Sequence, residues 1–343
     1  MSYDPSLPAT ARREHSSERR RVLRDVLGLV ISIASLAAFV WWALHQRRPH
    51  FPSSAGHIAL VVVAIALYAV ATLVRGWRWH RILRRADIDH RRADAFALTA
   101  VGYMGNTILP ARGGELLRIL LLGERSTARR REILGTIVAE RLLDALALVV
   151  LFCALTWTGI AGTHEGKLPA AIGVGIVALA AIGLVGYIEL RKRGKLERFA
   201  AAVRPFVRAS RLLFGRLGAA LAALTCGVWI LEGVIFWLVG SSLGLGMTVL
   251  EGTFLTVLTS FFLLIPAAPG YIGTFDGALV VGLHAIHIKG GQALAFVLLT
   301  RFVLFVPVTL AGLVLMFARY GGLRWLPTRS RRPSSTAREG ARG

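Results

Sequence analysis

Long apolar stretches constrain this chain more than any other feature of its sequence. An α-helix needs about 20 apolar residues to cross the hydrocarbon core of a bilayer. Runs of that size occupy roughly residues 25–44, 57–74, 134–158, 168–190, 217–240 and 293–318. Of the 343 residues, 55% are hydrophobic and only 17% are charged, which is unusually apolar for a water-soluble chain. The sequence therefore predicts an all-α polytopic membrane protein with six full spans.

Two further apolar regions, about 94–123 and 250–287, are each interrupted near the middle by proline and glycine. The first interruption lies in ILPARGGELLR, residues 108–118, and the second is PAAPGYIG, residues 266–273. Irregular backbone at bilayer depth is tolerated only where it is buried in protein or lines a wet cavity. We therefore expect two re-entrant helical hairpins. The residues expected to break them are Pro110, Pro269, Gly270 and Gly273.

The distribution of basic residues predicts the orientation, because positively charged loops are retained in the cytoplasm. With six spans, two hairpins and a cytoplasmic N-terminus, 33 of the 41 Lys and Arg residues fall in cytoplasmic segments and only 4 in outside segments. Making only one broken region a full crossing would place strongly basic loops outside. We expect a bacterial-type plasma-membrane protein with both termini cytoplasmic. Its predicted parts are a basic arm (1–24), a membrane domain (25–318, with halves 25–158 and 168–318) and a basic, disordered tail (319–343).

The two predicted halves have the same order of elements but begin on opposite sides of the membrane. Each reads span, span, hairpin, span, and each hairpin carries a carboxylate ahead of an arginine in the next helix. Glu115 precedes Arg141 by 26 residues, and Asp276 precedes Arg301 by 25. Inverted repeats with discontinuous helices are the architecture of secondary transporters. The sequence therefore predicts an inverted repeat.

Charged side chains inside the predicted membrane segments indicate a binding site, because each costs roughly 2.5–3.5 kcal/mol at a helix centre. Gly113 and Gly114 are expected to open a half-helix whose free N–H groups attract an anion. Arginine adds a planar fork suited to phosphate. The predicted substrate-binding residues are Arg112, Gly113, Gly114, Arg118, Arg141 and Arg301. The predicted charge-balancing or proton-carrying residues are Glu115, Glu140, Asp144 and Asp276. In the alternative interpretation, Arg141 pairs with Asp144 or Glu115 only to hold helices together.

Other motifs carry less information about function. The stretch RGWRWHRILRR, residues 75–85, is interpreted as an aromatic belt with contacts to anionic lipid. Cys153 and Cys226 lie in apolar runs and are interpreted as small hydrophobic residues. No nucleophile–base constellation, metal-ligand cluster, P-loop or dinucleotide fingerprint is recognised. We therefore expect no catalytic residue, cofactor, metal or nucleic-acid partner.

Four motifs occur in order: NTILPARGGELLR, AERLLDALAL, IPAAPGYIGTFDGAL and LLTRFVLFVP. Their series resembles that of the lysylphosphatidylglycerol synthase transmembrane-region family, also called flippase-like domain proteins, over roughly residues 25–318. The resemblance implies translocation of a lipid or lipid-linked headgroup between leaflets. Members that make aminoacylated lipids carry a large soluble synthetase domain after the membrane part, and that activity is not expected here. Two residues depart from the family pattern, since Tyr271 replaces the usual second glycine and Asp276 the usual glutamate.

These observations lead to one functional expectation and two alternatives. We expect a membrane protein, not an enzyme, whose partners are membrane lipids and which lets an anionic, phosphate-bearing headgroup cross while the acyl tails stay in the bilayer. The first alternative is a membrane enzyme acting on a lipid phosphate. The second is a non-transporting scaffold whose buried ion pairs are purely structural.

Overall fold

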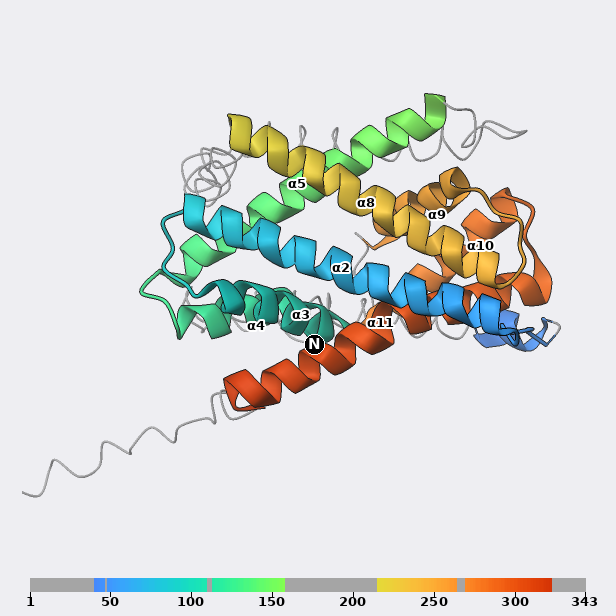
Figure 1. Ribbon diagram of the computed structural model, residues 1–343, viewed down its shortest axis with the longest axis horizontal. Helices are drawn as coiled ribbons and strands as arrows, with labels where there is room; N and C mark the ends of the chain where they lie inside the picture. Colours follow the sequence, from blue (N-terminus) through green and yellow to red (C-terminus); the bar gives the residue numbers. More distant parts are fainter. Residues whose placement is uncertain (1–39, 47, 110–112, 158–214, 264–268, 323–343) are drawn as a thin grey trace, which may run out of the picture.

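The computed structural model describes residues 40–46, 48–109, 113–157, 215–263 and 269–322, and helix is the regular structure of these segments (Figure 1). The all-α prediction is thereby confirmed. The elements are α2 (Ala55–Arg85), α3 (Arg92–Ile108), α4 (Gly113–Gly123), α5 (Arg130–Trp157), α8 (Arg216–Ser242), α9 (Val249–Phe262), the 3-10 turn η3 (Pro269–Tyr271), α10 (Thr274–Ala285) and α11 (Gly290–Tyr320).

Three of the predicted spans are helices long and apolar enough to cross a bilayer, namely α2, α8 and α11. At 31 residues each, α2 and α11 are about 46 Å long, which exceeds the roughly 30 Å hydrocarbon core. The predicted span 134–158 forms the continuous helix α5, although its charged residues keep it from meeting the same apolar criterion. The predicted span 168–190, and all but the last five residues of 25–44, lie outside the described segments.

The first broken region forms two antiparallel helices, α3 and α4, in close contact. A Cβ on Gly105 would lie 2.6 Å from the Cα of Gly114, so these positions bring the two backbones together. The side-chain oxygen of Asn106 accepts a hydrogen bond from the Gly114 N–H at 3.0 Å. As predicted, α4 begins at Gly113, while Pro110 lies outside the described segments.

The second broken region forms a matching pair, α9 and α10, joined by η3. Gly270 and Gly273 have φ of 66° and 88°, conformations that strain residues with a Cβ. Tyr271, the departure from the family's glycine, also has a positive φ of 55°, which costs on the order of 1 kcal/mol. Pro269 opens the turn. The helix is therefore interrupted at these positions, and Tyr271 occupies a conformation that favours glycine.

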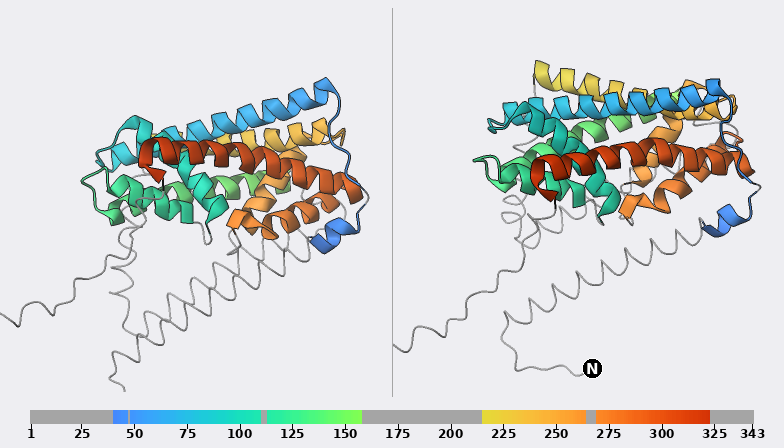
Figure 2. Two further views of the ribbon diagram at one scale, coloured as in Figure 1. Left: turned by 90° about the horizontal axis from the view of Figure 1, so that it is seen from below. Right: turned by 60° about the horizontal axis from the view of Figure 1, so that its bottom comes forward.

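The two helix pairs lie at opposite ends of the molecule and their broken segments meet between them. In Figures 1 and 2, α3 and α4 gather at one end and α9 and α10 at the other, while the long helices run between the ends. A Cβ on Gly270 would lie 3.4 Å from the backbone oxygen of Thr107, at the end of α3. Each half of the described chain thus has the order long helix, antiparallel pair, long helix.

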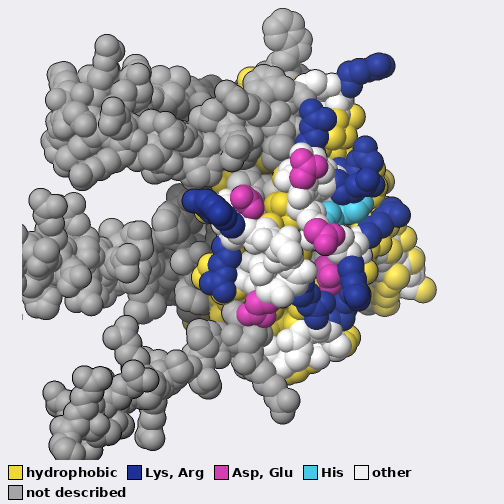
Figure 3. Space-filling view, turned by 90° about the vertical axis from the view of Figure 1, so that its left-hand side faces the viewer, with side chains coloured by type: hydrophobic (Ala, Val, Ile, Leu, Met, Phe, Trp, Pro, Cys, Tyr) yellow, Lys and Arg dark blue, Asp and Glu magenta, His cyan; other side chains and the backbone are white. Residues whose placement is uncertain are grey.

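One end of the molecule is rich in basic side chains. The C-termini of α2, α4 and α11 and the N-terminus of α8 lie at the left-hand end of Figure 1. Figure 3, which faces this end, shows Lys and Arg side chains gathered across it. The opposite end carries the N-terminus of α2 and the turns α8–α9 and α10–α11.

Replacement of Gly114 by alanine is expected to lower the free energy of unfolding by about 1–3 kcal/mol or more, as overpacked sites do. The added Cβ would overlap the backbone oxygen of Gly102 and lie 2.7 Å from the backbone nitrogen of Asn106, so α3 and α4 must separate. Gly227→Ala is the matched control, because a Cβ there meets nothing within 4 Å and alanine favours helix over glycine. Thermal unfolding in detergent measures both; equal melting temperatures for Gly114→Ala and the wild type would contradict the close approach.

Candidate functional site

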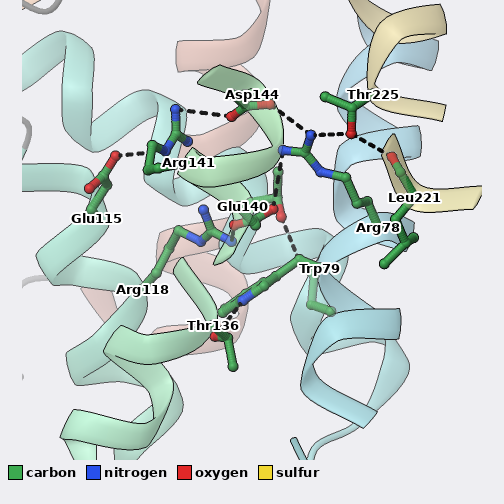
Figure 4. Close-up of polar contacts among 12 residues, drawn as sticks. Arg78, Trp79, Glu115, Arg118, Thr136, Glu140, Arg141, Asp144, Leu221 and Thr225 are labelled. Carbon is green, nitrogen blue, oxygen red and sulfur yellow. Dashed lines mark hydrogen bonds and ion pairs between the residues drawn. The ribbon is translucent and has the colours of Figure 1, made fainter. Parts of the chain in front are cut away.

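A buried network of arginines and carboxylates ties α2, α5 and α8 together (Figure 4). Arg78 on α2 donates through Nη1 to Asp144 Oδ1 at 2.7 Å and to Thr225 Oγ1 at 2.9 Å. Its Nη2 lies 3.6 Å from Glu140 Oε1. Because the Arg78 and Glu140 side chains are both only 2% exposed, this guanidinium depends on its partners rather than on water.

Arg118, on α4, is fixed within the same network. Its Nη2 donates to Glu140 Oε2 at 2.5 Å, and its guanidinium carbon lies 3.9 Å from the centre of the Trp79 ring system. The Trp79 indole in turn donates to Thr136 Oγ1 at 3.1 Å (Figure 4). Arg118, Trp79 and Glu140 are all buried, so this part of the network is tightly packed.

Arg141 differs from the other network arginines because its side chain is 40% exposed. Its Nε lies 3.2 Å from Glu115 Oε1 and its Nη1 lies 3.3 Å from Asp144 Oδ2. Asp144 therefore bridges a buried arginine, Arg78, and an accessible one, Arg141. Because these contacts are longer than the 2.7 Å contact of Arg78, Arg141 should exchange its partners at a lower cost in free energy.

Arg75, one helical turn before Arg78, forms a second buried ion pair. Its Nη2 donates to Glu232 Oε1 on α8 at 2.7 Å, and its guanidinium lies near the rings of Trp229 and Tyr103, at 5.5 and 5.9 Å from their centres. The other terminal nitrogen, Nη1, is buried and has no hydrogen-bond acceptor within the described segments. A buried guanidinium donor without an acceptor is costly, so this position favours an incoming anion.

A cavity of about 470 Å³ lies beside these groups and between the two helix pairs. Its charged lining consists of Arg75, Glu115, Arg141, Asp144 and Glu232. The rest is largely aromatic or aliphatic, with hydroxyl groups from α9. Ligand sites typically enclose about 300–1,000 Å³, mostly apolar, with a few convergent polar groups. This cavity is the candidate functional site.

Arg301 lies behind the wall of this cavity. It forms a bidentate ion pair with Asp276, with Nη2 to Oδ2 at 2.8 Å, and donates to the backbone oxygen of Gly270 at 3.2 Å. Asp276 also accepts from the Gly273 N–H at 2.8 Å. The guanidinium is 5.5 and 5.4 Å from the ring centres of Phe275 and Phe305, which line the cavity. Arg301 thus holds the strained turn of the second pair in place.

The structure divides the predicted site residues into three groups. Glu115, Arg141 and Asp144 line the cavity. Those placed in the surrounding packing are Gly113, Gly114, Arg118, Glu140, Asp276 and Arg301. Arg112 lies outside the described segments. The expectation that the Gly114 N–H is free for an anion is wrong, because Asn106 accepts its hydrogen bond.

The interpretation of residues 75–85 as a lipid-facing belt is wrong for three of its members. Arg75, Arg78 and Trp79 are buried, because α2 continues to Arg85 and this face packs against the network. The signal that could have revealed them is helical spacing: Tyr68, Thr72, Arg75, Trp79 and Ile82 form one buried stripe.

Comparison with known proteins places the chain in a family of membrane domains. The model of the lysylphosphatidylglycerol synthase TM region matches residues 26–312. The chain belongs to this family. Together with its candidate spans, the match makes the chain a multi-pass membrane protein.

Three curated relatives of this family member are similar at low identity. A UPF0104 membrane protein of Methanothermobacter thermautotrophicus is 24% identical over 83% of this chain and 92% of its own length. A UPF0104 membrane protein of Methanocaldococcus jannaschii is 23% identical over 62% of this chain and 92% of its own length. Glycosyltransferase AglD of Haloferax volcanii is 24% identical over 78% of this chain but only 50% of its own length.

Proposed function

We propose that this family member moves an anionic, phosphate-bearing lipid headgroup between membrane leaflets through the cavity between its two helix pairs. The observation that carries the proposal is the pair of cations that face this cavity. Arg141 is accessible and held only by contacts longer than 3 Å, and Arg75 presents a buried donor without an acceptor in the described segments. Arginine binds phosphate oxygens through its N–H donors, which Arg75 offers at Nη1 and which Arg141 offers once a carboxylate leaves it.

The charge balance of the site indicates how a bound carboxylate would be exchanged for the phosphate of the cargo. The four arginines of the site, Arg75, Arg78, Arg118 and Arg141, face four carboxylates, Glu115, Glu140, Asp144 and Glu232. An anionic headgroup therefore enters a formally neutral site and must displace a carboxylate from its arginine. Glu115 is the most accessible of these carboxylates, with 26% of its side chain exposed, and its contact to Arg141 is 3.2 Å. Glu115 balances Arg141 when the cavity is empty and releases it to the phosphate.

In this proposal, the helix pairs are re-entrant hairpins of an inverted repeat, with both termini in the cytoplasm of a bacterial-type plasma membrane. Three observations support it. The pairs lie at opposite ends, and the broken segments meet in the middle. The carboxylate–arginine pairs at equivalent spacings, Glu115–Arg141 and Asp276–Arg301, both form ion pairs. The arginine-rich end in Figure 3 is the end assigned to the cytoplasm.

Leaflet exchange in liposomes tests the proposal directly. The purified chain is reconstituted in vesicles containing a trace of phosphatidylglycerol labelled on its headgroup, and a membrane-impermeant reductant bleaches only the outer leaflet. Vesicles containing the protein are expected to lose nearly all of the signal, whereas empty vesicles should stop near half. Identical traces for protein-containing and empty vesicles would rule the proposal out for this lipid.

An enzymatic role is the second candidate, because one relative is named a glycosyltransferase. The alignment covers half of that protein, so its named activity need not lie in the matched half. Within the described segments, no group of three or more His, Cys, Asp and Glu side chains is placed to hold a metal ion. Mass spectrometry of the lipids recovered from the same vesicles distinguishes the candidates, since transport leaves the lipid chemically unchanged.

Single-cysteine labelling tests the proposed orientation. In a background with Cys153 and Cys226 replaced by alanine, a cysteine at Thr127, in the exposed α4–α5 turn, is expected to react only from the cytoplasmic side. A cysteine at Lys289, in the exposed α10–α11 turn, should react only from outside. A membrane-impermeant maleimide applied to intact cells and to inverted vesicles gives the readout. Labelling of both positions from one side would contradict the hairpins.

A further inference from the structure

A second hollow, larger than the candidate site, lies between α2, α3 and α11 and has a volume of about 720 Å³. Its lining is almost entirely apolar, and small side chains, among them Ala69, Ala93, Ala97 and Ala311, create the space. Ala69 and Ala311, on α2 and α11, are exposed, so the hollow is an open groove on the side of the helix bundle. In a membrane this surface faces lipid, and acyl chains can enter the groove without displacing protein.

One end of the groove is basic. Arg92, at the start of α3, and Arg319, in the last turn of α11, both line it. Arg319 and Arg125 share the single carboxylate of Asp94, at 3.2 and 3.1 Å, so positive charge is in excess at this end. This mouth belongs to the arginine-rich end of the molecule seen in Figure 3.

The dimensions of the groove match one leaflet. On α11 it extends from Pro307 to Arg319, which is about 18 Å of helix. Half of the hydrocarbon core is roughly 15 Å. An acyl chain lying along the groove would therefore place its phosphate at the two arginines and its methyl end near the bilayer midplane.

The groove also adjoins the polar cavity. Tyr68 and Val308 line both spaces, the first from α2 and the second from α11. These two residues stand between the apolar groove and the cavity that contains Arg75 and Arg141. A lipid held in the groove would thus lie beside the place where its headgroup would cross.

We propose that this groove is a binding site for one anionic phospholipid of the arginine-rich leaflet, with an acyl chain against Ala97 and Ala311 and its phosphate at Arg92 and Arg319. The claim that cargo enters through the groove rests on the proposed leaflet exchange. The claim that the groove binds a lipid does not require transport. The proposal specifies an anionic phospholipid and its entry into the cavity from the arginine-rich leaflet.

Native mass spectrometry of the purified chain in detergent, titrated with phosphatidylglycerol or with uncharged diacylglycerol, tests the groove. Ala311→Trp fills it from α11 and is expected to weaken retention of phosphatidylglycerol on the order of tenfold, which corresponds to about 1.4 kcal/mol. Ala223→Trp is the matched control, on the exposed surface of α8 outside both hollows. Arg92→Gln should reduce the preference for phosphatidylglycerol over diacylglycerol and leave diacylglycerol binding unchanged.

Ala69→Trp fills the groove from the opposite wall, α2. This variant replaces Ala311→Trp in the test if Ala311→Trp does not fold. If every folded groove variant retains phosphatidylglycerol as well as Ala223→Trp does, the groove is not the binding site. The vesicle assay separates this result from failure of the proposed function. Normal exchange by a groove-filled variant rejects the groove as the entry site for cargo. Groove binding without exchange by the wild type rejects transport alone.

Discussion

Replacement of Arg141 by leucine is expected to slow leaflet exchange roughly ten- to hundredfold, the equivalent of one hydrogen-bonded charged contact of about 1.5–3 kcal/mol. Arg141 is accessible and lines the cavity, so under the proposed function its loss removes a group that binds the phosphate. Arg141→Lys keeps the charge but loses the planar fork, and should recover only part of the rate.

Stability separates this effect from misfolding. Because Arg141 is 40% exposed and its contacts exceed 3 Å, Arg141→Leu should change the melting temperature in detergent much less than changes in the buried network. Arg129→Leu is the matched control, an exposed arginine at the α4–α5 turn that should leave exchange unchanged. Exchange at the wild-type rate in both Arg141 variants would show that this arginine does not contact the cargo.

Replacement of Arg78 by methionine is expected to lower the free energy of unfolding by roughly 3–5 kcal/mol, the cost of breaking a buried ion pair from one side. The change removes the 2.7 Å bond to Asp144 and the bond to Thr225, and leaves buried acceptors without their donor. Arg84→Met is the control, an exposed arginine on the same helix. Tryptophan fluorescence during thermal unfolding in detergent provides the measurement.

Two double variants show which pair is structural. Arg78→Met with Asp144→Leu removes both members of the buried pair, while Glu140 keeps Arg118 and Arg141 keeps Glu115, so much of the stability should return. Arg141→Leu with Asp144→Leu leaves Arg78 with its hydrogen bond to Thr225 and with Glu140 at 3.6 Å as its one carboxylate partner, and should be less stable than the first double variant. The opposite order of melting temperatures would assign the structural role to Arg141 and move the proposed phosphate contact to Arg75.

Local sequence determined much of this protein, because its signals do not depend on distant partners. Twenty-residue apolar runs specify helices such as α8 and α11, since a helix satisfies all of its backbone hydrogen bonds within one segment of chain. Proline and glycine mark where the second broken region turns, as the positive φ angles of Gly270 and Gly273 show. The equivalent spacings of Glu115 to Arg141 and of Asp276 to Arg301 were visible in the sequence, and both pairs form ion pairs in the structure.

The tertiary structure alone decided which arginine has which partner. Arg78 and Arg118 are both buried by partners on other helices, 66 residues away in the sequence for Arg78 and Asp144 and 22 residues away for Arg118 and Glu140. Arg75 belongs to the cavity only because α8 brings Glu232 and Trp229 against α2, across 157 residues of sequence. An ion pair forms between side chains that lie within a few ångströms of each other in space. A sequence pattern shows only which residues share one face of a helix, and not which other helix lies against that face. For that reason the sequence determined which membrane segments carry charge, and only the packing of α2 against α5 and α8 decided that Arg78 is buried while Arg141 lines the cavity.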